Sequence, residues 1–105
     1  MSVKLKLRNP ETNKEQVFTQ ELITARDVRR GLELQVELEK DEKNNLELLD
    51  LAVDFTAAVF KNKVTEDMIL DGLAGDKVWG VLGEVLKTVI NGGNPVEDAG
   101  KKEKQ

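Results

Sequence analysis

The side chains that could do chemistry in this sequence are almost all carboxylates. Asp and Glu make up 20 of the 105 residues, whereas His and Cys are absent. Two carboxylate pairs are spaced by one helical turn, Asp50 with Asp54 and Asp67 with Asp71. Such a pair could work as general acid and base if burial raised the pKa of one member. Both pairs fall on polar stripes of their helices, which favours solvated faces over a catalytic site.

Metal and phosphate sites are equally poorly supported. Without imidazole or thiolate, a metal site would depend on carboxylates alone. The segment Asp67–Gly72 ends like a calcium loop but lacks alternating oxygen ligands, and Gly72–Lys77 lacks the spacing of a phosphate-binding loop. The sequence therefore predicts no metal, no cofactor and no enzyme activity, and it favours a binding or structural module.

The formal net charge of −4 is unevenly distributed. Residues 1–19 carry a net +2 and residues 46–76 a net −5. An acidic helical middle repels phosphate, so we expect no nucleic-acid partner. No apolar run approaches the roughly 18 residues of a membrane span, and the N-terminus lacks the apolar stretch of a signal peptide. We expect a cytoplasmic protein without membrane contact.

A β-hairpin is predicted over residues 3–19. Val3, Leu5 and Leu7 alternate with basic residues, which is the period of a strand with one buried face. Turn-forming residues occupy positions 9–13, and a second strand follows. Because an isolated hairpin is only marginally stable in water, it must pack on helices.

Three main helices and one short helix are predicted after the hairpin, over residues 25–40, 46–62, 66–71 and 77–90. Thr24 and Asp27 have the spacing of a capping box, Thr65 caps the short helix, and Asp76 opens the last helix. The fold class is α+β, mainly α. Residues 1–93 form a single domain, and residues 94–105 are expected to be a flexible, disordered polar tail.

Two of these helices have unusual patterns. The apolar residues of 46–62 cover an arc of roughly 220°, whereas a surface helix needs little more than ~100°, so this helix should be central. The helix over 77–90 contains Gly80 and Gly83, each of which costs about 1 kcal/mol relative to Ala. They indicate either close approach of another backbone or a tolerated weakness.

Helix 25–40 carries apolar residues on two faces. Val28, Leu32 and Val36 share one face and form its main seam, while Leu34 and Leu38 point roughly 160° away. The stretch from Leu32 to Leu38 also alternates with period two, so a strand is the competing interpretation. The cap, the composition and the length favour a helix.

Four apolar residues are candidates for contacts with a partner or with a second copy: Leu34, Leu38, Phe60 and Trp79. The Leu34 and Leu38 pair lies off the main seam, so it forms either a second contact within the chain or a patch for association. Phe60 and Trp79 are large for so small a domain, and they serve either the core or an interface.

The ordered set of features resembles the tail assembly chaperones of long-tailed phages and prophages of Gram-positive bacteria. The resemblance spans residues 1–93. It rests on the Lys-rich hairpin, Thr24–Arg26, the stretches 49–55, 59–67 and 71–73, and an amphipathic last helix ending in Gly92-Gly93.

The resemblance implies a mainly helical protein that is not an enzyme. It would bind the tape measure protein and the major tail-tube protein during tail morphogenesis, self-associate into a homo-oligomer, and be absent from the mature virion. Two other functions remain open. One is a small regulatory nucleic-acid-binding protein that uses Arg26, Arg29 and Arg30, and the other is a structural virion or connector component.

Overall fold

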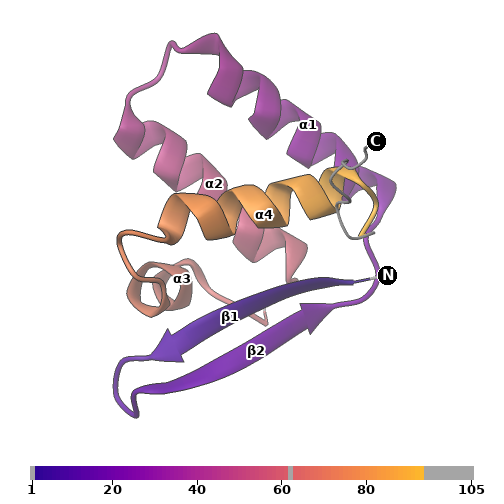
Figure 1. Ribbon diagram of the computed structural model, residues 1–105. Helices are drawn as coiled ribbons and strands as arrows, with labels where there is room; N and C mark the ends of the chain where they lie inside the picture. Colours follow the sequence, from indigo (N-terminus) through magenta and orange to yellow (C-terminus); the bar gives the residue numbers. More distant parts are fainter. Residues whose placement is uncertain (1, 62, 94–105) are drawn as a thin grey trace, which may run out of the picture.

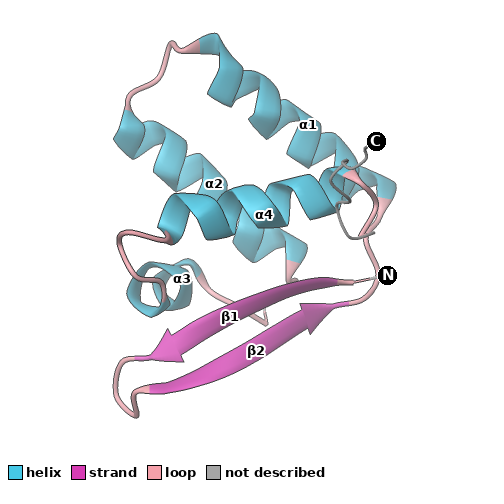
Figure 2. Ribbon diagram, viewed as in Figure 1, coloured by secondary structure: helices cyan, strands magenta, loops and turns pink. Residues whose placement is uncertain are grey.

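The fold is a β-hairpin packed on a group of four helices. The computed structural model describes residues 2–61 and 63–93. Its elements are β1 (Val3–Asn9), β2 (Lys14–Gln20), α1 (Ala25–Lys40), α2 (Asn45–Val59), α3 (Glu66–Gly72) and α4 (Val78–Ile90) (Figures 1 and 2). The predicted fold class is confirmed, and residues 32–38 are helical. The predicted polar tail, 94–105, lies outside the described residues.

The hairpin buries one face of its first strand. β1 and β2 pair antiparallel, with Val3 opposite Gln20 and Asn9 opposite Lys14. Val3, Leu5 and Leu7 are buried, whereas the basic residues between them are exposed, as the period of two predicts. β1 packs on α3 and α4, so these two helices supply the apolar partner that the hairpin needs.

Helix α4 lies between the hairpin and the other long helices. It contacts β1, α1 and α2, and Figure 1 shows the hairpin on one side of α4 and α1 on the other. Helix α2 contacts all three other helices, in agreement with its wide apolar arc. Three α2 side chains, Val53, Thr56 and Val59, are almost completely buried, and the Thr56 hydroxyl donates to the Ala52 carbonyl at 2.8 Å.

The end of α2 and the start of α4 differ from the sequence prediction for identifiable reasons. Helix α2 ends at Val59, not at residue 62, because Lys61 adopts a left-handed backbone (φ 52°) that interrupts the helix. Helix α4 begins at Val78 with Lys77 at the N-cap and no side-chain cap hydrogen bond, so Asp76 is not its cap. The Thr24–Asp27 capping box and the Thr65 cap are both present.

A buried carboxylate joins the start of α1 to the end of α2. The Asp27 carboxylate accepts hydrogen bonds from the Thr24 backbone N–H and the Thr24 hydroxyl, both at 3.1 Å. The Lys61 ammonium lies 3.1 Å from the same Oδ2 atom. Burial alone would raise the pKa of the Asp27 carboxyl, but these partners together hold that pKa below its usual value. Asp27 is therefore ionised at neutral pH.

Two glycines mark places where elements approach closely. A Cβ at Gly31 would lie 3.1 Å from Ile90 Cγ1, and one at Gly72 would lie 3.0 Å from the Arg8 carbonyl oxygen. Gly31 therefore lets α1 approach α4, and Gly72 lets α3 approach β1. A Cβ at Gly80 or Gly83 would meet nothing within 4 Å among the described atoms. For these two glycines, the described part of the chain supports a tolerated weakness rather than close approach.

The two ends of the described domain meet. The Ser2 backbone N–H donates to the Gly93 carbonyl at 3.1 Å. Gly92 and Gly93 both have positive φ, 74° and 93°, a conformation that glycine adopts at little cost. The turn after α4 thus brings the chain back beside the start of β1.

Replacing Asp27 by Asn should destabilise the fold in a pH-dependent way. Because the pKa of Asp27 is lowered by folding, its stabilisation is present above the unfolded pKa of about 3.9 and is lost as pH falls through the folded value. We expect Asp27→Asn to reduce the free energy of unfolding by about 1–3 kcal/mol at pH 7. The difference from wild type should shrink in urea titrations as pH falls below the unfolded value towards the lowered folded one. The exposed Asp54→Asn change is the control and should show neither effect.

Alanine substitutions at two glycines should have opposite signs. Gly72→Ala forces a methyl group against the β1 backbone, which cannot move aside, so we expect destabilisation of about 1–3 kcal/mol. Gly80→Ala adds a methyl in open space and should stabilise α4 by up to about 1 kcal/mol. Thermal unfolding measured by circular dichroism tests both. Equal shifts for the two variants would contradict the close approach of α3 to β1.

Candidate binding surfaces

The two carboxylate pairs lie on the surface of the domain. Asp50, Asp54, Asp67 and Asp71 are all exposed, so none is held in the apolar surroundings that acid–base catalysis needs. In residues 2–61 and 63–93, no group of three or more His, Cys, Asp or Glu side chains is placed to hold a metal ion. Over the same residues, no helix has the combination of length and apolar character needed to cross a membrane.

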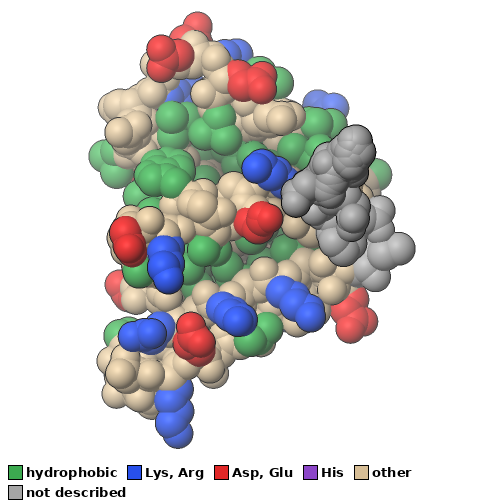
Figure 3. All heavy atoms as spheres, viewed as in Figure 1, with side chains coloured by type: hydrophobic (Ala, Val, Ile, Leu, Met, Phe, Trp, Pro, Cys, Tyr) green, Lys and Arg blue, Asp and Glu red, His purple; other side chains and the backbone are tan. Residues whose placement is uncertain are grey.

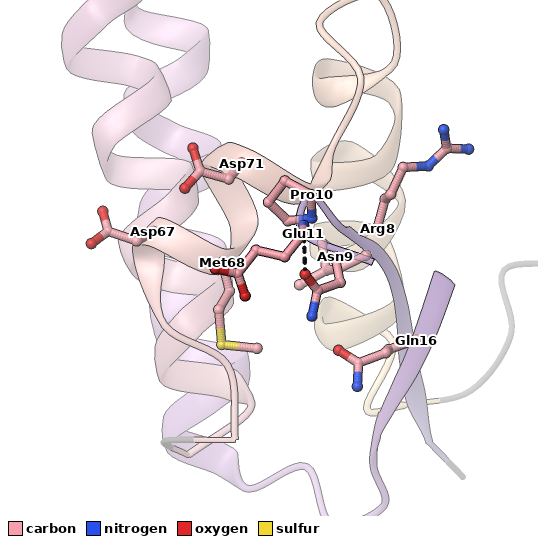
Figure 4. A pocket seen from close by; sticks show the side chains of 9 residues that line it. Arg8, Asn9, Pro10, Glu11, Gln16, Asp67, Met68 and Asp71 are labelled. Carbon is pink, nitrogen blue, oxygen red and sulfur yellow. Dashed lines mark hydrogen bonds between the residues drawn. The ribbon is translucent and has the colours of Figure 1, made fainter. Parts of the chain in front are cut away.

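A small pocket lies between the hairpin turn and α3. Its volume is about 260 Å³, and it is lined by residues of both elements, including Arg8, Met68 and Asp71 (Figure 4). The Glu11 backbone N–H donates to the Asn9 side-chain oxygen at 2.9 Å within the turn. The Asp67 and Asp71 carboxylates point away from the Met68 side chain, and Arg8 extends to the opposite side. These charged groups do not converge, so the pocket lacks the features of a reaction site.

The four predicted contact residues occupy different environments. Phe60 is fully buried and Leu34 is 6% exposed, so both side chains belong to the core of the chain. Leu38 is partly buried and packs against that core. Trp79 is 46% exposed. Trp79 is therefore the most exposed member of this set, and Leu38 is accessible only in part.

The assignment of faces on α1 is reversed relative to the sequence prediction. Leu32 and Val36, assigned to the main seam, are 44% and 49% exposed, whereas Leu34 is buried. The reason is the position of Gly31, which lies on the same side as Leu34 and Leu38 at ~100° per residue. Helix α4 packs where α1 has no side chain, and that contact selects the face. The signal that sequence reasoning missed is Gly31, a glycine inside the helix that precedes Leu34 by three residues and Leu38 by seven.

One side of α4 is partly exposed at the start of the helix and packs against α1 towards its end. At ~100° per residue, Trp79, Gly83, Leu86 and Ile90 fall along one stripe. A Cβ on Gly31 would lie within 3.3 Å of Leu86 and Ile90, so the second half of the stripe faces α1. Figure 1 shows α1 and α4 diverging towards the start of α4. The first half of the stripe, Trp79 and Gly83, is consequently left without α1 as a cover.

Hydrophobic side chains gather in this part of the surface. The space-filling view shows apolar groups above α4, in the region between it and helices α1 and α2 (Figure 3). Apolar surface that is continuous with a core and bordered by charged groups is typical of protein-binding sites. We call the exposed Trp79 and the partly exposed Gly83, with the adjoining surface of α4, the Trp79 face.

The fold defines a small, mainly helical α+β protein. Comparison with known families assigns it more closely, because a family described as phage tail chaperone protein matches residues 1–105. The chain belongs to this family, and the resemblance noted from its sequence is confirmed at this level. Comparison with curated proteins and with solved structures gives no match.

Charged substitutions on the two faces of α1 should separate core from surface. Leu34→Asp places a carboxylate in the core and should lower the free energy of unfolding by about 3 kcal/mol or more. Leu32→Asp changes an exposed position of the same helix and should cost less than about 1 kcal/mol. Urea unfolding followed by circular dichroism measures both values. A Leu34→Asp protein as stable as wild type would contradict the packing of α1 described above.

Proposed function

We propose that the protein is a tail assembly chaperone that binds the tape measure protein and tail-tube subunits during phage tail morphogenesis. Membership of the phage tail chaperone family supports a role in tail assembly. The structural observation that carries the finer proposal is the Trp79 face, a partly exposed apolar surface next to the core.

The Trp79 face has the chemistry expected of a site for a helical client. Tryptophan is enriched among the residues that contribute most to protein interfaces, since it buries a large area with few rotatable bonds. Gly83, one turn along the same stripe, presents no side chain that would hold a client away from α4. A client helix could therefore lie along the first half of α4 with its apolar side facing Trp79.

The remaining properties fit binding without catalysis. The net charge of −4 favours solubility of a protein that exposes apolar surface. A chaperone of this kind holds a hydrophobic helical client in solution until tube subunits polymerise around it. We propose that this takes place in the host cytoplasm and that the chaperone leaves before the virion is complete.

Co-expression with the tape measure protein tests this function. The tagged chain should keep the tape measure protein in the soluble fraction and co-purify with it. Trp79→Ala should reduce the amount recovered by about tenfold or more, as expected for a central interface residue. Leu70→Ala is the matched control, because Leu70 is 47% exposed but lies on α3. It should leave recovery within about twofold of wild type.

Three results would point away from this proposal. Absence of both tape measure and tail-tube protein from the purified complex would contradict the chaperone role. Detection of the chain in purified virions by mass spectrometry would favour a structural virion component. A salt-dependent gel shift that is lost on removing the charges of Arg26, Arg29 and Arg30 would favour a nucleic-acid-binding regulator.

A further inference from the structure

Helix α1 carries a second apolar surface on the side away from the core. Ala25, Val28, Leu32 and Val36 fall along one line of the helix, which we call the outer strip, and they line a shallow hollow with Arg29 and Glu33. The strip is about 16 Å long at 1.5 Å per residue. It lies roughly 145° around the helix from the face of Leu34 and Leu38. Because the face with Leu34 and Leu38 packs on the core, the outer strip points away from the core.

The charges of α1 are arranged in two blocks. The first half, residues 25–32, has three arginines and one aspartate, a net +2. The second half, residues 33–40, has three glutamates and one lysine, a net −2. A second α1 laid antiparallel would place each basic half beside an acidic half. A parallel arrangement would instead oppose like charges.

From this complementarity we propose that the outer strip binds the outer strip of a second copy, with the two α1 helices antiparallel about a twofold axis at Leu32. In that register Val28 of one copy lies opposite Val36 of the other, and the two Leu32 side chains meet at the centre. A twofold axis makes every contact occur twice, so one helix face supplies both halves of the interface.

The edge of the outer strip supplies a matching ion pair. Arg29 and Glu33 lie 3.7 Å apart in one helix, and their side chains are 74% and 61% exposed. In the antiparallel register both copies present this edge on the same side. Arg29 of one copy then lies next to Glu33 of the other, so the pair within each helix can be exchanged for two pairs between helices.

Other acidic groups on α1 are differently placed. Glu37 is held by its own Lys40 and Lys43, at 3.2 and 2.9 Å. Glu39 lies near the line of the outer strip at the C-terminal end of α1. The antiparallel register brings it to the N-terminal end of the partner helix, where the helix dipole and Arg26 favour a negative charge. Opposite charges therefore face each other at both ends of the contact, as they do near its centre.

The strength of this association should be modest. One helix from each copy buries less than the roughly 1,200–2,000 Å² of stable complexes, so the pair should be weak and reversible. The proposal does not depend on the chaperone function. The outer strip and the face of α1 that packs on α4 are separated by the body of α1, so pairing leaves the Trp79 face free for a client.

Sedimentation equilibrium over about 10–500 µM protein tests the contact, a range suited to a weak, small interface. Wild type should show a monomer–dimer equilibrium. Leu32→Glu should raise the dimer dissociation constant at least tenfold, since two carboxylates would meet at the axis. Leu70→Glu, at a similarly exposed leucine of α3, should leave it within about twofold. A monomer at all concentrations, or equal dissociation constants for wild type and Leu32→Glu, would overturn the proposal.

Charge reversal tests the ion pair independently of the apolar contact. Arg29→Glu sets a second carboxylate against Glu33 in the pair and should weaken dimerisation by about fivefold or more. Adding Glu33→Arg to the same chain restores opposite charges and should return the dissociation constant towards wild type. Failure of the double variant to recover would contradict the antiparallel register. Circular dichroism of each variant confirms that the fold is retained.

The lack of native cysteine allows a direct test of orientation. A mixture of Val28→Cys and Val36→Cys proteins should form a disulfide-linked dimer under mild oxidation, because the two positions are opposite each other. Val28→Cys alone should not, since the two sulfurs would be separated by about 12 Å along the helices. Efficient cross-linking of Val28→Cys alone, with no gain in the mixture, would exclude the antiparallel pair.

Discussion

The burial of α4 on more than one side is the constraint on which the other elements depend. Leu82, Val85, Leu86 and Val89 are all buried, and the helix contacts β1, α1 and α2. The hairpin has a single apolar face and needs α3 and α4 to cover it. Helix α1 can reach α4 because Gly31 leaves room for Leu86 and Ile90. In this chain of 105 residues α4 therefore contacts both the hairpin and the two long helices, and α3 likewise contacts both β1 and α2.

This arrangement explains why apolar surface remains exposed. Helix α1 packs on the second half of α4 and diverges from the first half. The side of α1 that carries the outer strip has no neighbour among residues 2–61 and 63–93. Trp79, Leu32 and Val36 lie outside the buried core, and each side chain is about half exposed. Such exposed apolar side chains are typical of surfaces that contact other chains.

Much of the fold could be predicted from local patterns, because those patterns are governed by neighbours in sequence. The alternation in β1, the Thr24 cap and the wide arc of α2 each reflect short-range geometry. The faces of α1 could not be assigned in the same way. Val28, Leu32 and Val36 are as apolar as Leu34 and Leu38, and the choice depends on where α4 approaches Gly31. The early end of α2 likewise depends on a left-handed Lys61 whose ammonium reaches Asp27, 34 residues earlier.

The hydrogen bond between Ser2 and Gly93 places the two ends of the domain next to each other. A short linker between these positions would cyclise the backbone, and new termini could then be opened at the exposed turn of the hairpin without removing a helix contact. Sequence fused before β1 or after Gly93 would leave from the same corner of the domain. The architecture can thus carry an additional segment at either end while the packing of its four helices is unchanged.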